Sequence, residues 1–168
     1  MTKEATVFEI NEYVFHLHCG VCKVRDIAAL PGDDSGNKYY VLSPLFGDDK
    51  GNIVRVPVAN ATSLRKPLKK AEAMELVKHW PNIHTDLYIV DSKLRKQMYE
   101  QTLSRGVLSE LAPLLEGAYQ RKARDGHLNS MDAQFVSRAT PIVYGELSLA
   151  LSMPFEEVRD YICEVNGF

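Results

Sequence analysis

The sequence lacks the marks of membrane, exported and disulfide-linked proteins. No stretch reaches the about 18 uninterrupted apolar residues that a membrane-spanning helix needs. The opening residues, Met1–Glu4, carry none of the apolar run of a signal peptide. Three cysteines, an odd number with no export signal beside them, argue against a disulfide framework. These absences predict a cytoplasmic protein without disulfides.

The sequence also lacks the signatures of the common enzyme classes. It contains no Gly-rich phosphate loop, no nucleophile elbow and no His-Glu-x-x-His motif. None of the five histidines stands in a recognisable acid/base setting. We therefore expect a protein that is not an enzyme, with no cofactor and no small-molecule substrate.

The chain has no excess of positive charge, since its formal net charge is −2 over 168 residues. Residues 1–70 hold ten basic and eight acidic groups, whereas residues 71–168 hold ten basic and fourteen acidic groups. The second half can therefore bind nucleic acid only where its basic residues cluster locally.

The first seventy residues have the pattern of short β-strands. Runs rich in β-branched and aromatic residues cover 13–17, 21–27, 38–42 and 53–57. Turn-rich segments of Gly, Asp and Asn at 31–37 and 47–52 separate them. Close spacing favours antiparallel pairing in a small barrel, because a barrel leaves no open sheet edge. The expected first domain is therefore a small antiparallel β-barrel spanning residues 1–69.

The second half changes to helical periodicity, which predicts an all-α bundle over residues 70–168. Helices are expected near 71–80, 92–104, 108–119, after Ser130 and at 154–165. Asp91 is the expected N-cap of the second helix, and Gly106 its end. Pro141 lies inside an apolar run, where an interior proline costs about 3 kcal/mol, so we expect a kink or a break there. The fold class is thus two-domain α+β.

His16, His18, Cys19 and Cys22 resemble metal ligands at first sight. On a strand, His16 and His18 would point one way and Cys19 the other, whereas zinc needs four ligands that converge. The Cys19-Gly20-Val21-Cys22 spacing also matches a redox dithiol, but that chemistry favours a helix N-terminus and these flanks are strand-like. We expect no metal, and we keep a small redox or zinc protein as a third hypothesis.

Basic residues gather at two helix ends in the second half. The candidate DNA contacts are Lys93, Arg95, Lys96, Arg121, Lys122, Arg124 and Arg138. Such residues favour phosphate contacts, although cations near a C-terminus also complement the helix dipole. The last helix carries four acidic residues against Arg159 alone, so we predict a packing helix and not a recognition helix.

Several strings resemble the CarD/CdnL family in one colinear order. They lie at residues 8–15 with His18-Cys19-Gly20, 55–58 (Arg-Val-Pro-Val) with Asn60-Ala61, 64–66 (Leu-Arg-Lys), 93–106, and 145–150 (Gly-Glu-Leu-Ser-Leu-Ala). One departure is Asn11, which replaces the family's usual glycine. The resemblance covers nearly the whole chain.

The resemblance implies a bacterial transcription regulator with two binding domains. A Tudor/SH3-like barrel would bind the RNA polymerase β subunit, with Arg55, Val56 and Pro57 as the matching contact string. A helical domain would contact promoter DNA without strict sequence preference and modulate open-complex stability. Arg95 and Arg138 match the family's DNA-contacting positions. The alternative is a binding module that tethers to polymerase, or to another partner, without touching DNA.

The resemblance also places a DNA-wedging Trp where this chain has Ser92. Tyr88 is the nearest aromatic residue in sequence and is the favoured substitute wedge. Trp80 is a poorer candidate, because its helical spacing with Ala71, Met74 and Val77 predicts burial.

Overall fold

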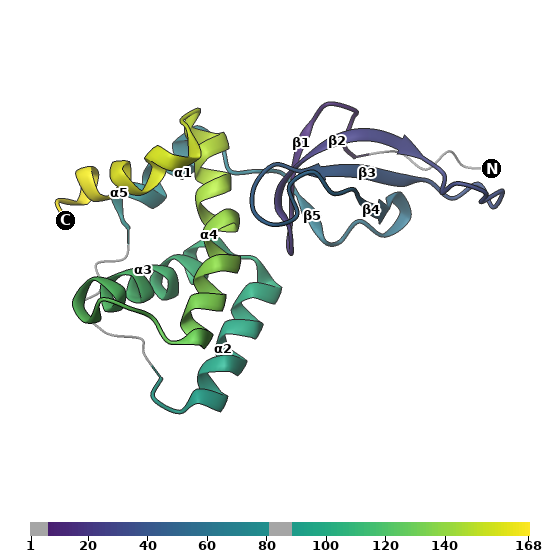
Figure 1. Ribbon diagram of the computed structural model, residues 1–168. Helices are drawn as coiled ribbons and strands as arrows, with labels where there is room; N and C mark the ends of the chain where they lie inside the picture. Colours follow the sequence, from purple (N-terminus) through teal and green to yellow (C-terminus); the bar gives the residue numbers. More distant parts are fainter. Residues whose placement is uncertain (1–6, 81–88) are drawn as a thin grey trace. The chain divides into compact units, whose positions relative to one another are not determined.

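The computed structural model describes residues 7–80 and 89–168, and the chain divides into two compact units, Met1–Pro67 and Leu68–Phe168. Figure 1 shows strands in the first and helices in the second, called here the β unit and the helical unit. None of the described helices is long and apolar enough to cross a membrane.

The β unit is one antiparallel sheet in the order β4-β3-β2-β1-β5. Its strands are β1 (Tyr13–His16), β2 (Gly20–Ala28), β3 (Tyr39–Pro44), β4 (Val54–Pro57) and β5 (Leu64–Arg65). The four predicted strands all form, and the sequence pattern missed β5 because two residues show no alternation. Since β4 and β5 have one paired neighbour each, they form the two edges of the sheet.

One apolar cluster lies against this sheet. Its buried members are Phe8, Val14, Cys22, Val24, Tyr40, Leu42 and Val56. Tyr40 Oη accepts the backbone N–H groups of Val7 and Phe8 at 2.9 and 3.3 Å, and its ring meets the Phe8 ring edge-on. The segment before β1 is therefore part of the fold.

Asn11 adopts a left-handed backbone conformation, with φ of 73°. Its N–H donates to the Val24 carbonyl at 2.7 Å, so the bend also holds the segment against β2. Asparagine is one of the few L-residues that visit this region readily, which explains how it replaces glycine here.

Over residues 68–80 and 89–168, the helical unit contains five α-helices. They are α1 (Lys70–Lys78), α2 (Ser92–Arg105), α3 (Leu108–Asp125), α4 (Ser130–Leu151) and α5 (Val158–Asn166), with a 3₁₀ turn at Phe155–Glu157 before α5. Helix α4 contacts each of the other four, and Figure 1 shows it running through the unit. Helix α4 is therefore the central element of this unit.

The predicted ends of α2 are confirmed. Asp91 accepts the N–H of Leu94 at 2.9 Å, and Gly106 closes the helix in a left-handed conformation with φ of 61°. Such caps satisfy backbone groups that a helix end leaves without an intrahelical partner.

The expectations for α4 and α1 are met only in part. Of the kink or break expected at Pro141, the break does not occur, because α4 continues through this residue. The missing N–H deprives only the carbonyl of exposed Ser137, which water can reach, while buried Ala139 and Ile142 pack on both sides. In α1 the buried face is formed by Ala73 and Val77, whereas Ala71 and Met74 are exposed.

Candidate polymerase-binding and DNA-binding surfaces

Strand β4 places the string Arg55-Val56-Pro57 on an edge of the sheet. Its register pairs Arg55 with Val41 and Val56 with Tyr40. Because side chains alternate along a strand, Arg55 and Pro57 are exposed while Val56 is only 4% exposed and belongs to the core. Val56, one of the three predicted polymerase contacts, therefore has its side chain in the core of the β unit and not on the surface.

Ile53 extends this exposed edge. It lies just before β4, and 59% of its surface is exposed despite its apolar side chain. We call Ile53, Arg55 and Pro57 the β4 surface. It combines a cation, apolar area and the free side of an edge strand, three features that suit a protein partner.

Comparison with known families gives the β unit its identity. Residues 8–68, which include all five strands, match the family model of the CarD-like/TRCF RID domain. The β unit belongs to this family. The RID domain marks the chain as an RNA-polymerase-interacting, transcription-related protein, and it confirms the resemblance read from the sequence. No curated protein sequence matches the chain significantly.

The match to the RID domain ends at residue 68, so the helical unit must be interpreted from its own geometry. Two of the seven predicted DNA contacts, Arg95 and Arg121, lie inside it. Their side chains are 5% and 9% exposed, and both approach the Asp132 carboxylate, at 3.2 and 3.7 Å. Tyr99 Oη donates to the same carboxylate at 2.7 Å. This buried charge cluster joins α2, α3 and α4.

Arg95 also fastens the segment that leads into α2. Its guanidinium donates to the carbonyls of Ile89 and Val90 at 2.6 and 3.3 Å. DNA contact by Arg95 or Arg121 would require breaking these internal bonds and would leave Asp132 buried without its partners. We therefore correct their assignment to structural residues of the helical core.

The other five predicted DNA contacts are exposed. Lys93 and Lys96 lie on α2, Arg138 lies on α4, and Lys122 and Arg124 lie at the end of α3. Arg124 forms an ion pair with Asp125 at 2.9 Å, which reduces its local positive charge. Lys96 and Arg138 line one pocket, so α2 and α4 bring together cations that the sequence keeps 42 residues apart.

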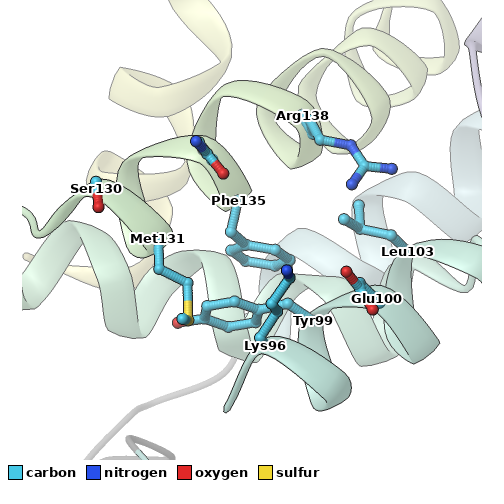
Figure 2. Close-up of a pocket in the computed structure, with 9 residues that line it drawn as sticks. Lys96, Tyr99, Glu100, Leu103, Ser130, Met131, Phe135 and Arg138 are labelled. Atoms are coloured by element: carbon cyan, nitrogen blue, oxygen red, sulfur yellow. The ribbon is translucent and has the colours of Figure 1, made fainter. Parts of the chain in front are cut away.

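That pocket lies between α2 and α4 and has a volume of about 240 Å³. Its lining residues are Lys96, Tyr99, Glu100, Leu103, Ser130, Met131, Gln134, Phe135 and Arg138. Figure 2 shows the rings of Tyr99 and Phe135 lying face to face among the lining residues, with Lys96 and Arg138 coming from different helices. Sequence reasoning missed this pocket, because its residues come from two segments, 96–103 and 130–138, whose proximity no sequence pattern shows.

The His/Cys cluster has a different geometry from the one expected. Strand β1 ends at His16, and residues 17–19 form a turn, so strand alternation does not govern His18 and Cys19. His16 Nδ1 accepts the N–H groups of His18 and Cys19 at 3.1 and 3.2 Å. Over residues 7–80 and 89–168, no three His, Cys, Asp or Glu side chains gather as a metal site would require.

The two thiols of the Cys19–Cys22 spacing are poorly suited to redox exchange. Burial raises the pKa of Cys22 to about 12, and burial and Asp49 raise the pKa of Cys19. The attacking species in such exchange is the thiolate, which a raised pKa makes scarce at neutral pH. Cys22 instead donates a weak hydrogen bond to the Gly20 carbonyl at 3.5 Å.

The wedge residues are placed as follows. Ser92 is exposed and is the first residue of α2, where it offers no ring for stacking. Tyr88 lies outside the described residues. Trp80 is 3% exposed, which confirms its predicted burial.

Proposed function

We propose that the chain is a non-enzymatic bacterial transcription regulator that binds the RNA polymerase β subunit and contacts promoter DNA to modulate open-complex stability. The observation that carries the proposal is the RID-family match over residues 8–68, in a unit whose edge strand exposes Arg55. In this proposal the five-stranded sheet is an open, Tudor/SH3-like sheet whose edge strands β4 and β5 do not pair with one another, and the β4 surface is its contact with polymerase.

The chemistry of the β4 surface supports a protein partner. An exposed arginine can form charge-assisted, two-pronged hydrogen bonds with a partner carboxylate. The free side of β4 can accept a further strand, and Ile53 adds apolar area beside it. The β4 surface can therefore bind a protein partner through an ion pair, through apolar contact and through backbone hydrogen bonds.

DNA contact falls to the exposed cations of the helical unit. Lys93, Lys96 and Arg138 are the main candidates, with Lys122 and Arg124 as a second group. Contacts of this kind reach phosphates, so binding would tolerate changes of sequence. Tyr88 stays the proposed wedge, because Ser92 has no ring to insert at the edge of melted DNA.

The test of polymerase binding is the Arg55→Glu variant of the full chain. Losing a close interfacial charge pair costs about 2–5 kcal/mol, so affinity for the isolated β subunit should fall at least about tenfold. Calorimetry measures the affinity, and Arg25→Glu, an exposed basic residue of β2, is the matched control. Equal affinities of the two variants, with folding intact by circular dichroism, would remove Arg55 from the interface.

A second candidate function is a binding module that tethers to polymerase without DNA contact. The burial of Arg95 and Arg121 favours it, because the helical unit then exposes fewer cations than its sequence suggests. Footprinting of an open promoter complex separates the two functions. Protection of DNA that depends on Lys96 and Arg138 supports the regulator, and its absence supports the module.

A further inference from the structure

We propose that the pocket between α2 and α4 binds one unpaired nucleotide of DNA, with the base inside the pocket and the adjoining phosphates on Lys96 and Arg138. This inference rests on the proposed DNA contact and specifies its ligand. Three features of the pocket support it, namely its size, its apolar floor and the charges around its rim.

The pocket has the size and lining of a site for one flat ring. Its volume of about 240 Å³ lies below the about 300–1,000 Å³ typical of sites for drug-sized ligands. The floor is apolar and consists of Tyr99, Leu103 and Phe135, each no more than 5% exposed, with half-buried Met131 beside them. A planar base would cover the part of this apolar lining that is still exposed.

The buried charge cluster holds this floor in place. The rings of Tyr99 and Phe135 stack with centroids 4.1 Å apart and planes 11° apart. Tyr99 Oη donates to Asp132 at 2.7 Å, and Arg95 holds Asp132 in turn. The ring of Tyr99 is therefore fixed at both its face and its tip, so the pocket exists before a ligand arrives and little ordering entropy is lost on binding.

The rim of the pocket carries two cationic side chains and two side chains that can accept hydrogen bonds. Lys96 and Arg138 are exposed cations contributed by different helices, which suits two neighbouring phosphates. Glu100, also on the rim, repels phosphate but can accept hydrogen bonds, while the Gln134 amide can both donate and accept. We assign the cations to the backbone and these two side chains to the edge of the base.

This division predicts which nucleic acid binds. In a duplex each base is paired and stacked, so only an unpaired base can enter a pocket. Adenine and cytosine carry an exocyclic amino group that can donate to Glu100, whereas thymine presents a carbonyl at the corresponding position. Single strands of dA or dC should therefore bind more tightly than single-stranded dT, and all of them more tightly than duplex.

The test is fluorescence anisotropy of labelled oligonucleotides with the full chain at low salt. Met131→Trp fills the pocket and should weaken binding of single-stranded dA about tenfold, because one base stacked on a side chain is worth roughly that factor. Duplex binding should not change. Gln97→Trp, at an exposed position of α2 outside the pocket, is the matched control and should leave both affinities unchanged.

A second variant keeps the proposal falsifiable should Met131→Trp disturb packing. Glu100→Gln changes an exposed side chain and introduces a donor for the thymine carbonyl, so it should abolish the preference for dA and dC over dT.

Equal binding of single strand and duplex, with no effect of either variant, would overturn this inference and leave the proposed DNA contact standing. Failure to bind DNA of any form would overturn both. Loss of polymerase binding in Met131→Trp, with DNA binding intact, would instead make the pocket a protein-docking site and also overturn the inference.

Discussion

At the scale of single residues, this protein shows how one carboxylate can decide the role of two arginines. Asp132 is 2% exposed, and Arg95, Arg121 and Tyr99 converge on it. A buried charge is tolerated only when opposite charges and hydrogen bonds compensate its lost hydration. The two arginines are therefore committed to the fold, although in sequence they look the same as the exposed basic residues around them.

Replacing this carboxylate should strongly destabilise the protein. Asp132→Ala removes the buried carboxylate that both Arg95 and Arg121 approach, which should lower the free energy of unfolding by about 3–5 kcal/mol. Urea denaturation followed by circular dichroism measures the change. Asp125→Ala removes a half-exposed carboxylate of the same unit and should leave the midpoint nearly unchanged. Similar losses in both variants would contradict the structural role of Asp132.

His16 gives the β unit a sensitivity to acid. Burial, and then the neighbouring His18, lower the pKa of His16 in the folded protein. Its Nδ1 must also be unprotonated to accept two backbone N–H groups. As pH falls below about 6.5, the unfolded chain takes up the proton first, so stability present above that pH is lost as pH falls toward the lowered folded-state pKa.

Amide hydrogen exchange in β1 and β2 should therefore become faster, relative to its intrinsic rate, between about pH 7.5 and 5.5. His16→Asn should reduce this pH dependence, since an amide oxygen can accept the same N–H groups without titrating. His18→Gln, at an exposed position, should largely retain it. If the pH dependence disappeared with His18→Gln and not with His16→Asn, His18 and not His16 would be responsible for the acid sensitivity.

At the scale of elements, α4 shows tertiary packing prevailing over local propensity. Pro141 lies near the middle of a 22-residue helix that continues through it. Buried residues on both sides of the proline, including Ala139, Ile142 and Val143, pack against other helices. The burial of several such side chains, at about 1.5–3 kcal/mol for each large one, exceeds the cost of one interior proline.

Pro141→Ala should therefore stabilise the helical unit. The change restores one backbone hydrogen bond and removes a steric clash, which raises the free energy of unfolding by up to about 3 kcal/mol. The greater conformational freedom of the unfolded chain lowers it by about 0.4–1 kcal/mol. Thermal unfolding measures the difference. Pro31→Ala, in an exposed turn, has no helix clash to remove. It should only increase the freedom of the unfolded chain and so slightly destabilise the protein. A lower melting temperature for Pro141→Ala would show that the ring itself is needed for packing.

At the scale of the whole molecule, charge is distributed so that DNA contact must be local. The net charge is −2, and the half that follows residue 70 is the more acidic. Long-range attraction to DNA is therefore weak, and affinity depends on a few cations placed close together. Lys93, Lys96 and Arg138 are exposed on two packed helices and provide such a group.

The salt dependence of duplex binding should report the size of this group. If three phosphates are neutralised, the logarithm of the binding constant should fall with the logarithm of salt concentration at a slope of about −2.7. Lys96→Gln should bring the slope closer to zero by about 0.9, whereas Lys78→Gln on α1 should not change it. A wild-type slope near zero would exclude phosphate contact by the helical unit.

Much of the architecture was predictable because it depends on local chemistry. Alternating residues identified four strands, and helical spacing with Asp91 and Gly106 identified the ends of α2. The string around Arg55 pointed to the family that residues 8–68 match. Each of these signals is carried by residues close together in the chain, so sequence alone determined them.

Tertiary structure decided which side chains remain available for binding. Arg95, Arg121 and Arg138 have the same functional group, yet of these three only Arg138 is exposed. The side chains of Arg95 and Arg121 are buried beside the Asp132 carboxylate. Val56 is buried between exposed neighbours, and the α2–α4 pocket joins residues from 96 to 138. Sequence by itself determined four of the five strands, the helices and the resemblance that the RID match bears out. Only the tertiary structure decided burial and the pocket, because both arise from contacts between residues distant in the chain.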